Sequence, residues 1–181
     1  MKKVYVFLAE GFEEIEALSV VDIVRRCGLP VQTVSISEDR QVTGSHGIPV
    51  LADSIFSKTD FSDAKALVLP GGLPGSDNLQ NCKELEKLLT EENEKDTLLA
   101  AVCAAPKVLG AFGLLQGKKA TCYPGYEPEL LGATPVEDRV AIDGNCIMSR
   151  GAGTAADFAF AIAKALGAET ENVYRGMLYH L

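Results

Sequence analysis

The chain has 181 residues, of which 47% are hydrophobic and 23% charged, and its formal net charge is −8. This length fits one domain with a sizeable core, and the negative charge argues against a nucleic-acid surface, which is basic. No apolar run approaches the roughly eighteen residues that a membrane span needs, and the first residues do not have the pattern of a signal peptide. Five cysteines without C-x-x-C spacing and two histidines predict neither a disulfide framework nor a zinc site. We therefore expect a cytoplasmic protein with reduced thiols, no metal and no membrane or nucleic-acid partner.

The first part of the chain predicts a β-α-β unit. Residues 3–8 and 31–36 are rich in β-branched and aromatic side chains, which indicates two buried strands. Residues 13–26 between them predict a helix, which Gly28 and Pro30 end. Such a unit favours a parallel sheet.

The predicted helix over 13–26 has an acidic start and an apolar stripe. Its core-facing stripe is expected to comprise Ile15, Leu18, Val21 or Asp22, and Val24 or Arg25. Three carboxylates in the first turn suit the positive end of the helix dipole, and most of them are expected in solvent: Glu13, Glu14 and Glu16. Glu16 is the exception, because it lies beside Ile15 on a face that turns inward.

The remaining chain predicts further strands and helices without a repeat or a linker. Short hairpins are expected around 45–47 and at 143–144. The strands are predicted over 66–69, 98–102, 119–123 and 146–149, and the helices over 82–94, 106–113, 155–166 and 170–179. We therefore predict one three-layer α/β domain over residues 1–181.

Cys103 lies where a buried strand turns into a helix. Pro106 fits the first helical turn, and Ala101 and Ala105 are the small neighbours that a nucleophile elbow needs. A thiol at a helix start is expected to have a lowered pKa. The alternative is an inert, buried core cysteine.

Other unusual residues follow the ends of other predicted strands, where sites form in parallel sheets. The backbone N–H groups of Gly72 and Ala104 are positioned to stabilise an oxyanion, although Gly71 and Gly72 alone also fit a plain turn. A carboxyl at Glu16, held in an apolar site beside a thiolate, would have a raised pKa and serve as general acid and base.

Two further patterns concern cofactors and histidine. Residues 151–156 match the G-x-G-x-x-A dinucleotide fingerprint, but no strand with a ribose-binding acid follows. Close packing of helix on strand explains the glycines better, so no cofactor is expected. A cysteine hydrolase needs an imidazole, and the candidates His46 and His180 do not follow a predicted strand end. A full Cys-His-acid triad is therefore not expected.

Four ordered motifs together resemble the DJ-1/ThiJ/PfpI superfamily over essentially the whole chain. They lie at 9–16, 69–72, 100–106 and 149–154. The similarity is to the DJ-1-like branch, because Ala104 follows the cysteine where the PfpI protease branch has histidine. The resemblance implies a flavodoxin-like, doubly wound α/β fold with a mostly parallel sheet between helical layers, as in class I glutamine amidotransferases, and a homodimer.

The resemblance also implies chemistry. Cys103 is the expected reactive residue, Glu16 its protonated partner, and Gly72 and Ala104 the oxyanion donors. The implied activity is a cofactor-independent glyoxalase or protein deglycase that acts on methylglyoxal-like dicarbonyls or their protein adducts. The alternative is a redox-sensing, stress-response chaperone in which Cys103 is oxidised to a sulfinate that Glu16 stabilises. An amidotransferase or peptidase is a third possibility, which the missing histidine disfavours.

Two residues depart from the family pattern. Tyr123 stands where some members have a histidine, and tyrosine is a poor base at neutral pH. His46 stands where relatives have an arginine at the dimer interface, so a dimer could bring it toward the partner's Cys103.

Overall fold

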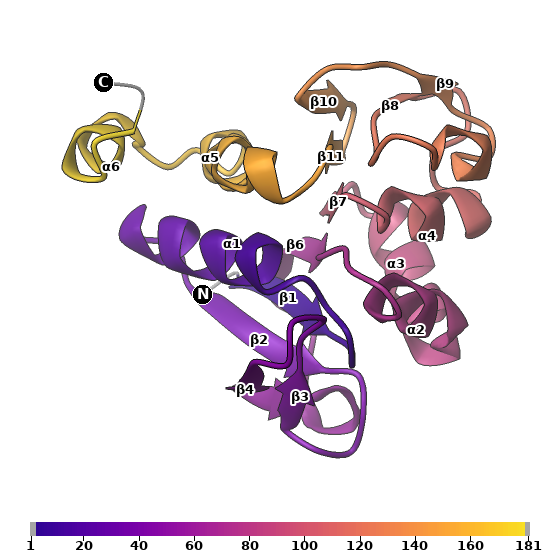
Figure 1. Cartoon of the computed structure of the whole chain (residues 1–181), viewed down its shortest axis with the longest axis horizontal. Helices are drawn as coiled ribbons and strands as arrows, with labels where there is room; N and C mark the ends of the chain where they lie inside the picture. The colour runs from indigo at the N-terminus through magenta and orange to yellow at the C-terminus, as the bar shows by residue number, and fades with distance from the viewer. Residues whose placement is uncertain (1–2, 180–181) are drawn as a thin grey trace.

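The computed structural model describes residues 3–179, and its centre is a seven-stranded sheet (Figure 1). The strand order is β10-β11-β7-β6-β1-β2-β5, and only β10 and β11 pair in antiparallel fashion within this sheet. The bounds are β1 (Lys3–Leu8), β2 (Val31–Ser35), β5 (Ser54–Ile55), β6 (Ala64–Leu69), β7 (Leu98–Val102), β10 (Val140–Asp143) and β11 (Cys146–Ser149). The predicted mostly parallel α/β fold is confirmed.

Helices cover both faces of the sheet (Figure 1). One layer consists of α1 (Glu14–Arg26) and α5 (Ala155–Ala165), and the other of α2 (Gly75–Asn81), α3 (Lys83–Asn93) and α4 (Pro106–Ala111). A hydrophobic core lies on each face of the sheet, and each strand contributes to both because successive side chains point to opposite faces. In β1, Val4 and Val6 pack in the core under α1 and α5, whereas Tyr5 and Phe7 pack in the core under α3 and α4.

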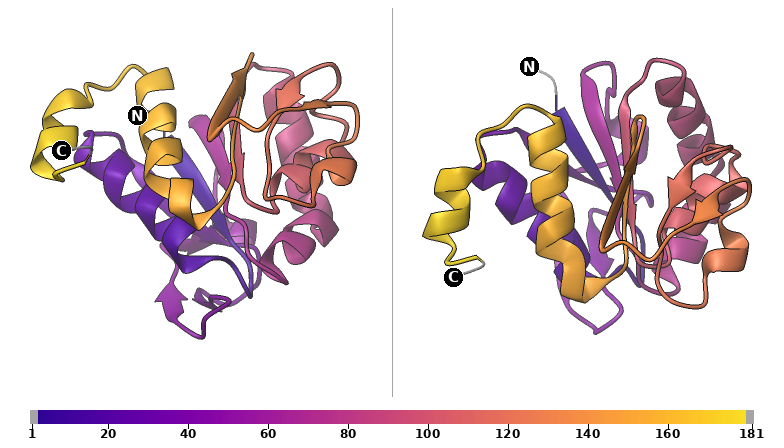
Figure 2. Two further views of the ribbon diagram at one scale, coloured as in Figure 1. Left: turned by 45° about the horizontal axis from the view of Figure 1, so that its top comes forward. Right: turned by 90° about the horizontal axis from the view of Figure 1, so that it is seen from above.

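Smaller elements surround this framework. Figure 2 shows α6 (Glu171–Gly176) outside α5, where Tyr174 stacks on Phe160 with ring centroids 4.0 Å apart. Two short sheets consist of the hairpin β3 (Gln41–Thr43) with β4 (Pro49–Leu51), and of β8 (Lys119–Ala120) with β9 (Thr134–Pro135). The described part of the chain also contains three 3-10 turns: η1 (Phe56–Lys58), η2 (Glu127–Glu129) and η3 (Ala152–Thr154).

Several predicted elements differ in extent. Both expected hairpins form, but residues 75–81 form α2, which the sequence pattern did not predict. The strand predicted over 119–123 has two residues, and the last helix is six residues long. None of the helices within residues 3–179 has the length and apolar character required to cross a membrane.

The predicted apolar stripe of α1 is wrong in its first half. Ile15 and Leu18 are 56% and 39% exposed, whereas Glu14 and Glu16 are buried. The reason is that the β3–β4 hairpin and the strand ends cover the side of the first turn that carries the carboxylates. Further along α1 the buried side chains are apolar, namely Ala17, Val20, Val21, Ile23 and Val24.

Candidate functional site

Cys103 forms the sharp turn between β7 and α4. Its φ is +63°, a left-handed conformation that is unusual for a residue with a side chain. The backbone is held on both sides, since its N–H donates to the Ser149 carbonyl at 3.0 Å and its carbonyl accepts from the Tyr123 N–H at 2.8 Å. The thiol is partly buried, so the turn presents it at the carboxyl end of the sheet.

The two glycines after β6 allow the chain to pass close to this turn. A Cβ on Gly71 would lie 2.5 Å from Cys103 Cβ and 2.6 Å from Glu16 Oε2. Gly72 has φ +88°, and a Cβ there would meet the Glu13 backbone nitrogen at 2.5 Å. Glycine is therefore required at both positions, and the segment is more than a plain turn.

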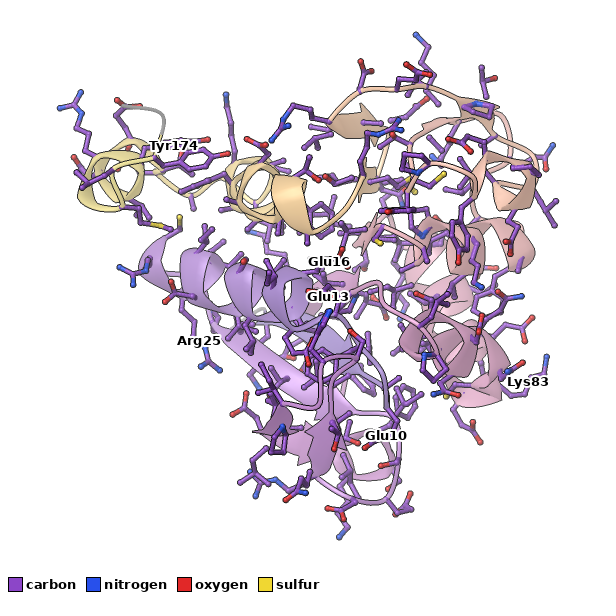
Figure 3. All side chains as sticks on the ribbon, in the orientation of Figure 1. Glu10, Glu13, Glu16, Arg25, Lys83 and Tyr174 are labelled. Atoms are coloured by element: carbon purple, nitrogen blue, oxygen red, sulfur yellow. The ribbon has the colours of Figure 1, made fainter. Side chains whose placement is uncertain are left out.

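Glu16 is the buried acid of the site, at 1% exposure. Figure 3 shows Glu13 and Glu16 together at the start of α1. The Gly71 N–H donates to Glu16 Oε2 at 2.8 Å, whereas Oε1 has no hydrogen-bond partner of regular geometry among residues 3–179. Burial raises the pKa of Glu16 to about 7, and the Gly71 N–H and the Cys103 thiol act in the opposite direction.

The expected lowering of the Cys103 pKa is not what the structure gives. Burial, and after it the charge and hydrogen bond of Glu16, raises the pKa of the Cys103 thiol to about 12. The N–H groups of Gly72 and Ala104 oppose this rise. Two negative charges so close together repel each other, so the pair titrates as one coupled unit. A thiolate at neutral pH therefore requires that Glu16 keeps its proton.

A pocket of about 250 Å³ opens over the thiol. Glu13 is the only charged side chain in its wall among the described residues. The lining otherwise consists of Ser45, Gly72, Leu73, Cys103, Ala104, Tyr123 and Tyr126. The site can therefore hold a small, uncharged molecule against the sulfur.

Tyr123 stands at the rim of the pocket and is half exposed. A Cβ on Gly151 would lie 3.4 Å from the Tyr123 ring and 3.9 Å from Glu16 Oε1. Gly151 thus packs beside the site, whereas a Cβ on Gly153 would meet nothing within 4 Å, so close packing of helix on strand does not explain the second glycine.

His46 is not at the thiol within this chain. Its side chain is 67% exposed, and Nδ1 lies 2.8 Å from Glu14 Oε2 and 3.3 Å from Glu13 Oε2. These contacts correct the expectation that most of the early glutamates are solvated. Burial raises the pKa of Glu14, but a hydrogen bond to the His46 ring and others to backbone N–H groups outweigh it and lower the pKa to about 2, and the bond to the ring also raises the pKa of His46. His180 lies outside the described residues.

This cluster also supplies a possible set of metal ligands, since one ligand atom of each of Glu13, Glu14 and His46 lies within 4.8 Å of the others. Glu14 already accepts from the backbone N–H of His46 at 2.9 Å and pairs with the ring. The arrangement is satisfied as a hydrogen-bonded structural cluster.

Sequence reasoning missed three pocket residues: Ser45, Leu73 and Tyr126. Tyr126 follows Tyr123 by three residues, which places both rings on one loop, but the periodicity of an irregular segment gives no sign of this. Leu73 directly follows Gly72, and its 47% exposure depends on the turn at the end of β6.

The family model for the DJ-1/PfpI family matches residues 2–165. The chain belongs to this family. It is 42% and 41% identical to the DJ-1 homologs B and A of Arabidopsis thaliana over 91% of its length, and spans 38% and 43% of those relatives. It is 32% identical to a deglycase from Pyrococcus horikoshii, over 82% of this chain and 89% of that one. Oxidized DJ-1 of Toxoplasma gondii, at 32% identity, superimposes with a TM-score of 0.95 over 100% of both chains.

Proposed function

We propose that this DJ-1/PfpI family protein is a cysteine-dependent, cofactor-independent glyoxalase or deglycase. The observation that carries the proposal is the placement of Cys103, on a strained turn beside the buried Glu16 and facing the N–H groups of Gly72 and Ala104. A nucleophile, an acid and two oxyanion donors are the groups that addition to a carbonyl needs. The deglycase relative supports the same substrate class.

The proposed reaction begins when the Glu16 carboxylate takes the proton of the Cys103 thiol, which gives a thiolate beside protonated Glu16. Sulfur adds to the aldehyde carbon of methylglyoxal, the N–H groups of Gly72 and Ala104 bind the developing oxyanion, and Glu16 gives it a proton. The Glu16 carboxylate then takes the proton from that carbon and returns it to the neighbouring carbon, while the hydroxyl proton moves from the oxygen of the first carbon to that of the second, which leaves a lactate thioester. Water breaks the C–S bond while Glu16 takes its proton, so methylglyoxal and water yield lactate without an oxidant or reductant.

The same site supports deglycation of an amine adduct of methylglyoxal. The thiolate forms the C–S bond at the carbinol carbon, the C–N bond breaks, and the departing amine takes its proton from Glu16. The resulting hemithioacetal follows the route above. A reducing compartment such as the cytoplasm would keep Cys103 available as a thiol.

The direct test is lactate formation from methylglyoxal by the purified protein, compared with a Cys103→Ser variant. Lactate above that control supports the proposal, and its absence overturns it. His46 does not lie at the thiol within this chain, and His180 is outside the described residues. We therefore do not propose amidotransferase or peptidase chemistry.

A second candidate function, a redox-sensing stress-response chaperone, is favoured by Glu16 Oε1, which has no hydrogen-bond partner of regular geometry among the described residues. When Glu16 is protonated on this buried oxygen, its O–H can donate to an oxygen atom added to the neighbouring Cys103 sulfur. Peroxide would convert the thiolate to a sulfenate and then a sulfinate, with one water released at each step.

We predict that mild peroxide adds two oxygen atoms selectively to Cys103. In a Glu16→Ala variant the sulfinate loses its hydrogen-bond partner, so the product should be absent or oxidised further to the sulfonate. Intact mass and peptide mapping measure both results. Equal oxidation of the half-buried Cys27 and Cys82 would contradict a selective sensor.

We also propose that the chain forms a homodimer through the exposed apolar side of α1 and the neighbouring β3–β4 hairpin. Ile15 and Leu18 of α1 are joined there by Ile48, which is 51% exposed and whose N–H contacts Glu14. Leu51 on β4 is 66% exposed. A second copy of the chain would cover this surface and bring His46 toward the partner subunit's site.

For this dimer we predict that Ile15→Glu raises the dimer dissociation constant by at least about a hundredfold, because a charge would be buried in an apolar contact. Light scattering coupled to size exclusion measures the change. Ile142→Glu is the matched control, since Ile142 is 60% exposed on β10. An Ile15→Glu protein that is as dimeric as wild type would rule out this face.

A further inference from the structure

Lys107 is a buried lysine that the proposed chemistry does not use. It is the second residue of α4, four positions after Cys103, and its side chain is 8% exposed. Lysine is almost never this buried unless its charge is paired. The question is what its partners hold in place.

The partners of Lys107 come from two other segments. Its Nζ lies 2.5 Å from Asp77 Oδ1 in α2 and 3.9 Å from Glu129 Oε2 in η2. It also lies 5.4 Å from the centre of the Tyr126 ring, within the range of a cation–π interaction. One ammonium group therefore joins α4 to α2 and to the loop over residues 126–131, which contains η2.

The loop is docked against α4 at a second point. A Cβ on Gly110 would lie 2.6 Å from the Glu129 carbonyl and 2.8 Å from the Leu131 nitrogen. The glycine thus permits direct contact between helix and loop backbone. This contact and the Lys107 pair hold the same loop from two places along one helix.

Both segments that Lys107 joins carry walls of the Cys103 pocket. Tyr126 lines the pocket directly, and Asp77 belongs to the helix that follows Gly72 and Leu73, which also line the pocket. Loss of the Lys107 ammonium would remove the cation–π contact with the Tyr126 ring and the ion pair with Asp77 that links this ring to α2.

We propose that Lys107 is a positioning residue, which fixes the Tyr126 wall of the Cys103 pocket and thereby limits the size of the carbonyl substrates that reach the thiol. The proposed limit on substrate size rests on the proposed function. The underlying limit on which molecules reach the Cys103 sulfur is independent of that function, and it can be tested without measuring turnover.

The access test compares labelling of Cys103 by a small reagent, iodoacetamide, and a bulky one, N-phenylmaleimide, with peptide mapping as readout. In Lys107→Leu the ratio of bulky to small labelling rates should rise by about two- to fivefold, as expected for loss of one cation–π contact. Lys107→Arg keeps the charge and should retain the wild-type ratio. Lys83→Leu removes a surface lysine paired with Glu86 and should also leave the ratio unchanged.

A double-mutant cycle tests the route through Tyr126. Tyr126→Leu alone should raise the same ratio, and adding Lys107→Leu should cause no further rise, because both remove the same wall. An unchanged ratio in Lys107→Leu, or additive effects in the double variant, would overturn the proposal. Asp77→Asn, at a half-exposed position, is expected to shift the ratio in the same direction and decides the case if Lys107→Leu does not fold.

Turnover gives the matching result for substrates. In Lys107→Leu the KM for methylglyoxal should rise by about two- to fivefold with kcat unchanged. The ratio of kcat/KM for the bulkier phenylglyoxal to kcat/KM for methylglyoxal should rise. Wild-type protein that labels as predicted but forms no lactate would remove the glyoxalase proposal and leave the role of Lys107 intact. A changed kcat with an unchanged labelling ratio would assign Lys107 to the chemistry and overturn the positioning role.

Discussion

Replacing Cys103 by serine should reduce lactate formation from methylglyoxal by at least about a thousandfold, to the level of the uncatalysed reaction. Serine occupies nearly the same space on the turn, so the fold and the pocket are retained. Its hydroxyl is a far weaker nucleophile than a thiolate, and within residues 3–179 no imidazole lies beside it as a base. Initial rates at neutral pH with saturating methylglyoxal measure the loss.

The control for this change is Cys27→Ser, which removes another partly buried thiol at the C-cap of α1. It should keep wild-type activity. A Cys103→Ser protein that retained more than about a tenth of the activity would show that the sulfur is not the nucleophile, because every turnover in the proposed route requires the bond to this sulfur.

The second large effect is expected for Glu16→Gln, with opposite consequences for activity and stability. Activity should fall by about a hundredfold to ten-thousandfold, the usual contribution of a general acid and base. Glutamine still accepts the Gly71 N–H at the same place, so the change removes proton transfer without opening a cavity. Lactate formation as a function of pH measures it, and the inflection near the Glu16 pKa of about 7 should disappear.

The stability of the folded chain should rise in the same variant. The pKa of Glu16 is raised from 4.5 to about 7 on folding, so the unfolded chain releases this proton first as pH rises. Wild type therefore loses stability between pH 4.5 and 7, by about 3 kcal/mol once the group is ionised in both states. Glutamine never ionises, so the gain should be full at pH 8 and vanish below pH 4.5.

Urea unfolding at pH 8 and pH 4 measures this difference. Glu84→Gln, an exposed carboxylate in the first turn of α3, is the matched control and should change neither activity nor the pH dependence of stability. Equal stability of Glu16→Gln and wild type at pH 8 would contradict the raised pKa. Full activity would contradict the assigned proton transfer.

Local patterns in the sequence were enough to locate the strands and the residues at their ends. In a parallel sheet the carboxyl ends of the strands meet at one edge, so Cys103, Glu16 and Gly72 were expected near one another without coordinates. The structure brings them together, with Gly71 between the thiol and the carboxyl. The short helix α2 was missed because its seven residues carry no clear apolar period.

The orientation of α1 shows what such patterns leave open. A helical period predicts one buried face, and Ile15 and Leu18 fit that face better than glutamate does. The hairpin residues 45–48 instead supply N–H groups and an imidazole that hold Glu14, so the acidic side turns inward at the first turn. Partners more than thirty positions away decided this burial.

The positions of the core strands, the turn at Cys103 and its neighbours at the sheet edge thus follow from short-range periodicity and residue type, whereas the order of the strands is seen only in the folded sheet. The protonation of the Cys103–Glu16 pair and the Tyr126 wall held by Lys107 follow only from the packed chain. Both depend on burial and on contacts between distant segments, such as Asp77 with Lys107. Burial raises the pKa of each member of the pair, and how far it does so is a property of the surrounding atoms, which no local pattern contains.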